Sequence, residues 1–304
     1  MKLSTSTFQN TLKSQDTEEW IDLLVYRPAG YCWALFFKRM KIRPNTVTLF
    51  SILSGIASGV MFYFTDLRLN IVGMLLLIWA NTYDSADGQL ARMTGQYSRA
   101  GRILDGAAGE FWFISIYAGI CLRLTPTWGL WIWLLAAVTG YFHGKQAAMA
   151  DYLRNFHLLI VKGKSRSELD DYSVLKEQLK SLTWKNNFIE KFYLTYYTSY
   201  TKDQEDRTPE LQNLRATMKE KFGDSELPSG VGEEFRLRSR PMMKYTNILS
   251  FNTRSFALFA SLFAGLPWIY FVFEVTVLNI LLIYMLHKYE NICKRFNLRL
   301  RGND

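Results

Sequence analysis

The sequence predicts an all-α integral membrane protein with six transmembrane helices, an N-terminal interfacial amphipathic helix and a cytoplasmic helical insertion. Two observations support this fold class. Apolar residues are concentrated in two blocks, at 45–149 and 247–287, and the charged residues lie mostly outside them. Both blocks contain runs close to the roughly 20 residues that a helix needs to cross a hydrocarbon layer. A soluble globular domain would instead repeat short apolar sets along its whole length.

Residues 1–43 are expected to form an N-terminal tail and then a helix on the membrane surface. The first ten residues, MKLSTSTFQN, lack the apolar core of a secretory signal peptide, so we expect the spans themselves to direct the chain to a membrane. Residues 18–41 combine apolar and aromatic side chains with a basic end. This composition is typical of a helix that lies in the interface.

Six spans follow from the two apolar blocks. The segment 44–149 contains four of them, at 46–65, 69–91, 103–123 and 127–148. The segment 246–290 contains two more, at about 247–264 and 268–287, separated by Gly265-Leu266-Pro267. Pro44-Asn45-Thr46 is a helix-start signature for the first span. Gly55 and Gly59 form a GxxxG pattern, which indicates close packing against another helix.

The basic residues indicate the orientation of these spans. The formal net charge is +9, and 33 of the 36 lysine and arginine residues fall in segments that a six-span topology places on one side. By the positive-inside rule, both termini and the long segment 145–244 are expected in the cytoplasm. The charge therefore indicates topology and contact with anionic lipid rather than nucleic acid. Cys32, Cys121 and Cys293 are too few and too scattered for a disulfide scaffold or a CxxC site.

Residues 150–245 form a hydrophilic insertion, and 291–304 form a basic C-terminal tail. Helical spacing occurs in 167–182 and around 184–200. The aromatic residues of the second stretch would either rest on the membrane surface or belong to a small soluble core; they are Phe188, Phe192, Tyr193, Tyr196, Tyr197 and Tyr200. The basic stretch 236–240 indicates contact with anionic lipid, with a substrate contact as the alternative.

Three carboxylates stand at the facing ends of the second and third predicted spans. Asp84 and Asp87 lie near the end of one helix, and Asp105 lies near the start of the next. Charged groups inside membrane spans are costly, so they indicate a functional site. Helical geometry places Asp84 and Asp87 on one stripe, and the short connection brings Asp105 beside them. Three carboxylate oxygens form a hard-ligand set that suits Mg²⁺ or Mn²⁺.

Small residues share the stripe of the aspartates. Gly88 and Ala91 lie on the same helix face as Asp84 and Asp87, and Gly101 shares a face with Asp105. These positions leave room for a bulky ligand. Arg92 and Arg102 offer charge to phosphate. Divalent metal, phosphate and no nucleophilic serine or cysteine together indicate phosphoryl transfer, in which positioning and charge neutralisation supply most of the catalysis.

These residues resemble the motif of the CDP-alcohol phosphotransferases (CDP-alcohol phosphatidyltransferases), D-x2-D-G-x2-A-R-x8-G-x3-D-x3-D. Seven positions agree in residue and spacing: Asp84, Asp87, Gly88, Ala91, Arg92, Gly101 and Asp105. The Pro-Asn-x-x-Thr start of the first span at 44–48 is similar too. The resemblance implies that the three aspartates hold divalent metal, and that Gly88, Ala91 and Gly101, with Arg92 beside them, bind the cytidine diphosphate group. It implies transfer of a substituted phosphate from a CDP-linked donor to an alcohol, with release of CMP.

The last position of the motif is Gly109 instead of aspartate. In the family that residue completes the metal site and is the presumed general base. Glu110 is one substitute, but five residues from Asp105 is about 140° away on a regular helix, so it would need a π-bulge. His143 and Asp151 are other candidate bases. Three hypotheses follow: an active transferase with a relocated base, an enzyme of altered chemistry, or a catalytically silent relative that binds a CDP-ligand or a partner enzyme.

The expected partners are the lipid bilayer, a CDP-linked donor and an alcohol acceptor, and a homodimer is a further expectation. CDP-diacylglycerol is the preferred donor, and an inositol or glycerol phosphate is the preferred acceptor. Lys145 and Arg254 lie on the fourth and fifth predicted spans, where they could reach an acceptor phosphate. The alternative for both is snorkelling to the interface. Ionisable groups that gather at one membrane face argue against a transporter or channel.

Overall fold

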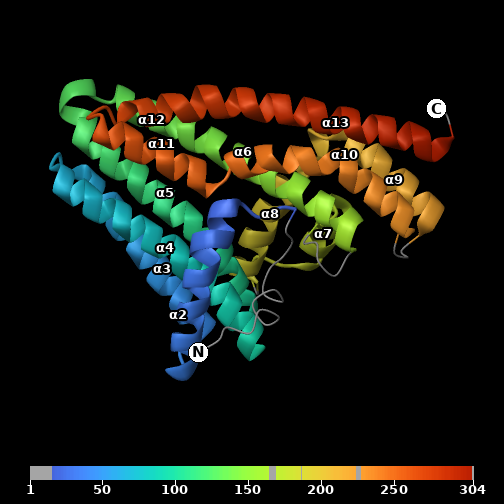
Figure 1. The fold of residues 1–304 in the computed structure, drawn as a ribbon, viewed down its shortest axis with the longest axis horizontal. Helices are drawn as coiled ribbons and strands as arrows, with labels where there is room; N and C mark the ends of the chain where they lie inside the picture. The colour runs from blue at the N-terminus through green and yellow to red at the C-terminus, as the bar shows by residue number, and fades with distance from the viewer. Residues whose placement is uncertain (1–15, 164–168, 186, 224–226, 303–304) are drawn as a thin grey trace. The chain divides into compact units, whose positions relative to one another are not determined.

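A computed structural model describes residues 16–163, 169–185, 187–223 and 227–302, and every regular element in these ranges is helical (Figure 1). The chain divides into two compact units. The first unit comprises Met1–His143 and Asn252–Thr276, and the second comprises Gly144–Phe251 and Val277–Asp304. The all-helical prediction is therefore confirmed for the described residues.

The first unit contains the predicted spans that carry the aspartates. Its helices, in chain order, are η1 (Asp22–Tyr26, π-helical), α2 (Arg27–Arg39), α3 (Pro44–Tyr63), α4 (Leu67–Thr94), α5 (Arg99–Trp128), the first part of α6 (Trp131–Lys162), α11 (Phe251–Phe263) and α12 (Trp268–Phe273). In Figure 1, α3, α4 and α5 run side by side.

Glycines allow α3 to approach α5 closely. A Cβ atom at Gly55 would overlap the ring of Trp112, and one at Gly59 would overlap the backbone of Ser115. On the opposite helix, a Cβ atom at Gly119 would overlap the carbonyl oxygen of Gly59. The GxxxG pattern is thus a helix-packing feature, as the sequence indicated.

The N-terminal helix α2 packs on α4. Ala34 and Phe37 of α2 are buried in one cluster with Ala86 and Leu90 of α4. Close approach is helped by Gly30, since a Cβ atom there would lie 2.9 Å from Oγ of Ser85. The predicted N-terminal helix therefore exists over η1 and α2, and one of its faces is buried by protein. Its position in a membrane interface remains a prediction.

Among the described residues, three helical stretches are long and apolar enough to cross a membrane: Pro44–Tyr63, Leu104–Trp128 and Trp268–Arg301. They support a membrane protein and coincide with the first, third and sixth predicted spans. The other predicted spans lie on α4, α6 and α11, which are helical. That these three also cross a membrane, and that both termini face the cytoplasm, are still predictions.

One predicted boundary is displaced. The sequence placed a turn between spans at 124–126, but α5 continues through Pro126 to Trp128. Pro126 has no N–H group to donate to the Leu122 carbonyl, so the last turn has one backbone hydrogen bond fewer than a regular helix but continues. The helix ends instead at Gly129, whose φ of +58° lies in the region that favours glycine.

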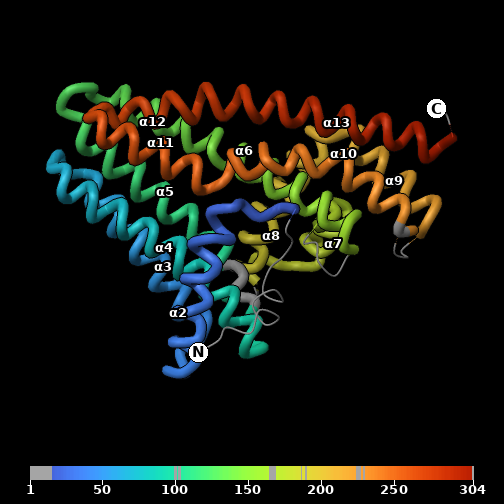
Figure 2. The backbone as a smooth tube through the Cα atoms, viewed as in Figure 1, coloured from blue at the N-terminus to red at the C-terminus, as the bar shows by residue number. Residues whose placement is uncertain are grey.

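The second unit consists of the remaining helices. They are the second part of α6, then α7 (Tyr172–Ser181), α8 (Phe188–Asp206), α9 (Pro209–Phe222), α10 (Ser229–Ile248) and α13 (Asn279–Arg301). The π-helical η3 (Glu274–Leu278) leads into α13, and its first three residues belong to the first unit. Helix α13 packs along α9 and α10, which can be followed in Figure 2. A buried aromatic cluster joins α6, α10 and α13; its members are Phe156, Phe235, Tyr289 and Phe296.

The hydrophilic insertion is helical, as predicted, but it does not begin at a helix end, because α6 runs on to Lys162. Helix α8 has a buried side and an exposed side. Leu194, Thr198 and Thr201 are buried, whereas Phe192 and Tyr196 are exposed. One side of α8 thus belongs to a small protein core, and the other side carries aromatic rings on the surface.

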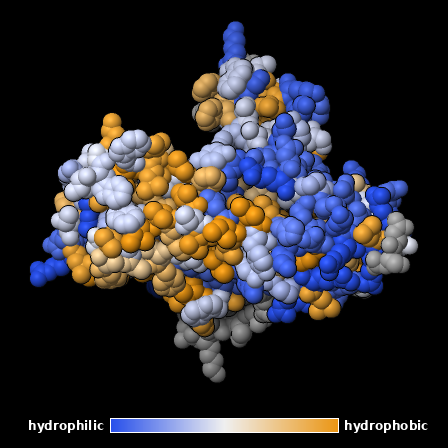
Figure 3. Space-filling model, turned by 90° about the horizontal axis from the view of Figure 1, so that it is seen from above, coloured by the Kyte–Doolittle hydropathy of each residue, from blue (hydrophilic) through white to orange (hydrophobic). Residues whose placement is uncertain are grey.

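Exposed apolar side chains are abundant on the helices of the predicted spans. Figure 3 shows hydrophobic residues over a broad area of one face and hydrophilic residues over another area of the same face. Large exposed apolar residues of α3, α4 and α5 include Leu53, Val60, Leu75, Trp79 and Ile114. A soluble monomer rarely exposes such contiguous apolar surface, so this surface suits contact with lipid.

Candidate active site

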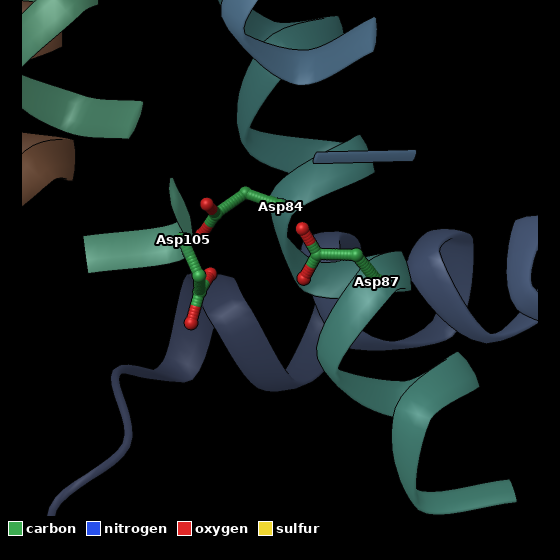
Figure 4. Close-up of side chains that lie close together, drawn as sticks. All are labelled: Asp84, Asp87 and Asp105. Atoms are coloured by element: carbon green, nitrogen blue, oxygen red, sulfur yellow. The ribbon is translucent and has the colours of Figure 1, made fainter. Parts of the chain in front are cut away.

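The three aspartates predicted from the sequence lie together. Asp84 and Asp87 come from α4 and Asp105 comes from α5, and their carboxylates converge in Figure 4. One oxygen of each carboxylate lies within 4.8 Å of the others. Their negative charges repel one another, so a cation bound between them would stabilise the arrangement.

This set of oxygens fits a divalent cation. Mg²⁺ binds oxygen at about 2.0–2.1 Å, so two of its ligands are no more than roughly 4.2 Å apart, and larger cations allow somewhat more. The spacing among Asp84, Asp87 and Asp105 is therefore close to that of ligands around one ion. The three carboxylates could hold Mg²⁺ or Mn²⁺ after small side-chain rotations.

Helix α3 fixes Asp87. The Thr48 hydroxyl group donates a 2.5 Å hydrogen bond to Oδ2 of Asp87, and both side chains are buried. A carboxylate has about four lone-pair positions, so this bond leaves Asp87 able to bind a cation. Thr48 belongs to the Pro-Asn-x-x-Thr pattern, but the sequence alone did not indicate that it contacts Asp87.

The same pattern holds the start of α5. Asn45 Nδ2 donates to Oγ of Ser98 over 3.1 Å, and Ser98 Oγ accepts the backbone N–H of Gly101 over 2.9 Å. Ser98 is thus the N-cap of the helix that carries Asp105. A Cβ atom at Gly101 would overlap Oδ1 of Asn45 and lie 2.8 Å from Oγ of Ser98. Only glycine fits this position without displacing the cap.

The remaining motif residues surround the open side of α4. Gly88 and Ala91 are partly exposed and Arg92 is exposed. A Cβ atom at Gly88 would lie 3.5 Å from Nη1 of Arg92, so the guanidinium group lies over this glycine. Their expected contacts with cytidine diphosphate remain a proposal. The side chain of Arg102 lies outside what the structure describes.

Gly109 leaves open space where the family has aspartate. A Cβ atom added there would have no atom within 4 Å. Helix α5 is regularly α-helical from 105 to 110, so Glu110 stays on a different face from Asp105. Glu110 is exposed and lies close enough to His143 to interact electrostatically with it. The π-bulge that would bring Glu110 to the aspartates does not occur between 105 and 110.

His143 and Arg254 meet in a buried polar network. Arg254, which is 1% exposed, donates from Nη1 to Oε2 of Glu274 over 2.6 Å. His143 Nδ1 lies 3.1 Å from the same oxygen and 2.9 Å from Arg254 Nη1. Tyr117 donates to Oε2 of Glu274 over 2.9 Å. Neither Glu274 nor Tyr117 was a site candidate from the sequence.

Lys145 belongs to the second unit, whereas the aspartates belong to the first. Its Nζ is 3.0 Å from Oδ2 of Asp203 on α8. Burial alone would raise the pKa of Asp203, but hydrogen bonds from Arg207 and Lys145 lower it overall. This lysine is thus engaged in an ion pair.

Residues 41–150 match the family model of the CDP-alcohol phosphatidyltransferases. The match contains α3, α4 and α5, and therefore all three aspartates. A bifunctional IPC transferase and DIPP synthase from Aquifex aeolicus (strain VF5) is 27% identical over 100 residues, which are 33% of this chain and 22% of that protein. The chain thus spans about a fifth of the length of this relative. No solved structure matches the chain. Each of these two matches covers about a third of the chain.

Proposed function

We propose that this protein transfers a substituted phosphate from a CDP-linked donor, CDP-diacylglycerol in the first instance, to an alcohol acceptor, with release of CMP. The observation that carries the proposal is the convergence of Asp84, Asp87 and Asp105 from two helices. The family match at 41–150, which contains all three, and a relative named as a transferase support it.

The reaction balances without a covalent enzyme intermediate. The acceptor hydroxyl oxygen forms a bond to the β-phosphorus of the donor, and the bond from that phosphorus to the bridging oxygen breaks. CMP leaves with the bridging oxygen, and the acceptor proton passes to a base. A divalent cation held by the three aspartates would neutralise charge on the diphosphate. Asp87 is kept in position by Thr48, and Arg92 offers its charge to a phosphate beside Gly88.

The base is relocated in this proposal, since Gly109 offers no proton acceptor. Glu110 and His143 are the two candidates. His143 is already in contact with Tyr117, Arg254 and Glu274, which fixes its ring. Glu110 is exposed and available to an acceptor. We propose Glu110 as the base for an acceptor whose hydroxyl group lies over its own face of α5, which is not the face of Asp105.

An inositol or glycerol phosphate is the proposed acceptor. Arg254 and Lys145 were candidates for its phosphate, but both are paired with carboxylates. For either to bind acceptor phosphate, it would have to exchange its carboxylate partner. An acceptor role for Arg254 or Lys145 therefore requires the loss of an ion pair.

The test is an assay of CMP release by the purified full-length chain in lipid, with labelled CDP-diacylglycerol, Mg²⁺ or Mn²⁺ and a panel of acceptors. We expect release that requires metal and falls at least about 100-fold in Asp105→Asn, because loss of a metal ligand removes charge neutralisation. Asp66→Asn, at the N-cap of α4, is the control for loss of one carboxylate elsewhere. Metal-independent release, or full activity in Asp105→Asn, would overturn the proposal.

A catalytically silent relative is the second candidate, favoured by Gly109. The open space at this position accepts a side chain, so Gly109→Asp should fold. A general base contributes typically 10²- to 10⁴-fold. No release by the natural chain with any acceptor, together with release by Gly109→Asp, would establish the silent relative. Release by the natural chain that falls in Glu110→Gln supports the relocated base.

A further inference from the structure

Two lysines and two tyrosines form a cluster on α10 and α13 that the proposed transfer reaction does not use. The rings of Tyr245 and Tyr284 lie 5.3 Å apart in an edge-on arrangement. Lys244 Nζ lies 4.8 Å from the centroid of the Tyr245 ring, and Lys288 Nζ lies 5.7 Å from that of Tyr284. All four residues belong to the second unit. We call them the Tyr–Lys cluster.

The Tyr–Lys cluster carries positive charge that no carboxylate of the described residues neutralises. Within those parts of the chain, neither Lys244 nor Lys288 pairs with an acidic side chain. The neighbouring hydroxyl group of Tyr284, followed by the Lys244 ammonium group, lowers the pKa of Tyr245. Two ammonium groups and two phenolic hydroxyl groups are a donor set that suits a phosphate.

Helix α13 shows where this cluster lies relative to lipid. Ile280, Tyr284 and Lys288 follow one another at four-residue intervals, so they form one stripe. Ile280 and Ile283 are each 68% exposed, and Tyr284 is 43% exposed. The exposed surface therefore changes along the helix from aliphatic to aromatic to basic. That order is typical of a helix that passes from hydrocarbon through the interface into water.

Helix α10 repeats the order in the opposite chain direction. Lys244 is exposed, Tyr245 follows it, and the exposed Ile248 ends the helix. Since α10 and α13 pack on each other, the two tyrosines meet at one level. Both helices thus carry lysine, tyrosine and isoleucine in this spatial order around the pair of tyrosines.

The predicted basic contact at 236–240 differs from this cluster. Arg236 donates to Glu233 over 3.1 Å, and Arg238 donates to Glu234 over 2.9 Å. Both arginines pair with carboxylates of their own helix. Lys244 and Lys288 of the Tyr–Lys cluster have no such carboxylate partner among the described residues, so their charge is available to another ligand.

We infer that the Tyr–Lys cluster binds the headgroup phosphate of an anionic phospholipid. The acyl chains would lie along the exposed isoleucines of α13, and Lys244 and Lys288 would bind the phosphate from either side. The tyrosine hydroxyl groups would donate to its remaining oxygens. A free phosphate ion would satisfy the same donors but would leave the isoleucine surface without a partner.

The test measures lipid retained by the detergent-purified full-length chain, by native mass spectrometry, after titration with phosphatidylglycerol or phosphatidylcholine. We expect preferential retention of phosphatidylglycerol. In the double variant Lys244→Gln/Lys288→Gln, apparent affinity for phosphatidylglycerol should fall roughly ten-fold or more, because two basic residues near an anionic headgroup are lost. The affinity for phosphatidylcholine should not change.

The matched control is Lys202→Gln/Lys219→Gln, which removes two exposed lysines from α8 and α9. It should keep the affinity of the natural chain, and equal melting temperatures in phosphatidylcholine should show that both double variants fold. A loss no greater in the cluster variant than in the control would overturn the inference. Displacement of phosphatidylglycerol by millimolar inorganic phosphate would overturn the assignment to lipid and indicate a site for the free ion.

Discussion

The Thr48 hydroxyl group lies 2.5 Å from Oδ2 of Asp87, although the two residues are 39 positions apart and on different helices. The bond joins the first predicted span to the candidate metal site on the second. A hydroxyl donor keeps the carboxylate in one rotamer, and hydrogen-bonded carboxylates are better prepared to bind a cation. Thr48 is therefore a positioning residue, since it acts through Asp87.

Replacing Thr48 by valine should weaken metal binding while leaving the fold intact, because valine preserves the shape of the side chain and removes the donor. We expect apparent affinity for Mn²⁺ to fall roughly 10- to 100-fold, with Thr48→Ser restoring most of it. Titration of the purified chain followed by electron paramagnetic resonance measures this directly. Thr82→Val is the control, because the Thr82 hydroxyl group donates to the Ile78 carbonyl of its own helix. Equal Mn²⁺ affinity in Thr48→Val and Thr82→Val would contradict the positioning role.

Gly101 and Gly106 make a matched pair on α5. A Cβ atom at Gly101 would overlap Asn45 Oδ1, whereas one at Gly106 meets nothing within 4 Å. Gly101→Ala should break the contact between Asn45 and Ser98 and lower the melting temperature as well as CMP release. Gly106→Ala should be neutral or stabilise by up to about 1 kcal/mol, since alanine favours a helix. Thermal unfolding of both variants in lipid measures this difference, and an equal effect of the two substitutions would show that the cap at Ser98 is unimportant.

Much of this site could be predicted because it depends on spacing within single helices. Asp84 and Asp87 share a stripe for geometric reasons, and a short connection had to bring Asp105 near them. The contact of Thr48 with Asp87 and the bond from Tyr117 to Glu274 depend instead on how neighbouring helices are rotated. Sequence periodicity gives no information on that rotation.

The predicted spans agree with helices, but several ends differ for local reasons. Gly129 rather than Pro126 ends α5. The positive φ of Gly129 stops the helix, whereas Pro126 removes only one backbone hydrogen bond. Helix α6 continues well beyond the predicted span, since its polar second half packs inside the second unit. Tyr152 in that half lies within hydrogen-bond distance of Gln212, with Gln212 Nε2 donating over 2.7 Å.

The buried pair of Arg254 and Glu274 should be needed for stability. Glu274→Gln leaves the Arg254 charge buried without its 2.6 Å partner, and breaking a buried pair typically costs about 3–5 kcal/mol. The double variant Arg254→Met/Glu274→Gln should recover most of the lost free energy of unfolding, because it buries no unpaired charge. A double-mutant cycle from thermal unfolding gives the coupling. If Arg254 instead serves the acceptor, Arg254→Met would raise the acceptor KM without lowering the melting temperature.

Glu290 lies on α13, beyond the end of the sixth predicted span. We expect its ionisation to make the melting temperature of the chain depend on pH. Its carboxylate accepts the backbone N–H groups of Glu210 over 2.7 Å and of Leu211 over 3.1 Å, at the start of α9. Burial raises the pKa of Glu290 above its ordinary 4.5, although the two N–H donors oppose the rise. The folded chain therefore holds this proton more tightly than the unfolded chain does.

A raised folded-state pKa means that the contribution of Glu290 to stability is fully present below about pH 4.5 and is lost as pH rises through the folded pKa. Glu290→Gln cannot ionise, so the melting temperature of the natural chain should fall relative to this variant as pH rises from about 4 to about 8. A ten-fold tighter hold on the proton in the folded chain corresponds to about 1.4 kcal/mol of this loss.

Glu177→Gln on α7 is the control for this titration, because hydrogen bonding to Lys180 lowers the pKa of the exposed Glu177. Its melting temperature should therefore not rise relative to the natural chain over the same pH range. A difference in melting temperature between the natural chain and Glu290→Gln that stays constant with pH would show that the N–H bonds balance burial, and one that grows in favour of glutamate would show that they outweigh it.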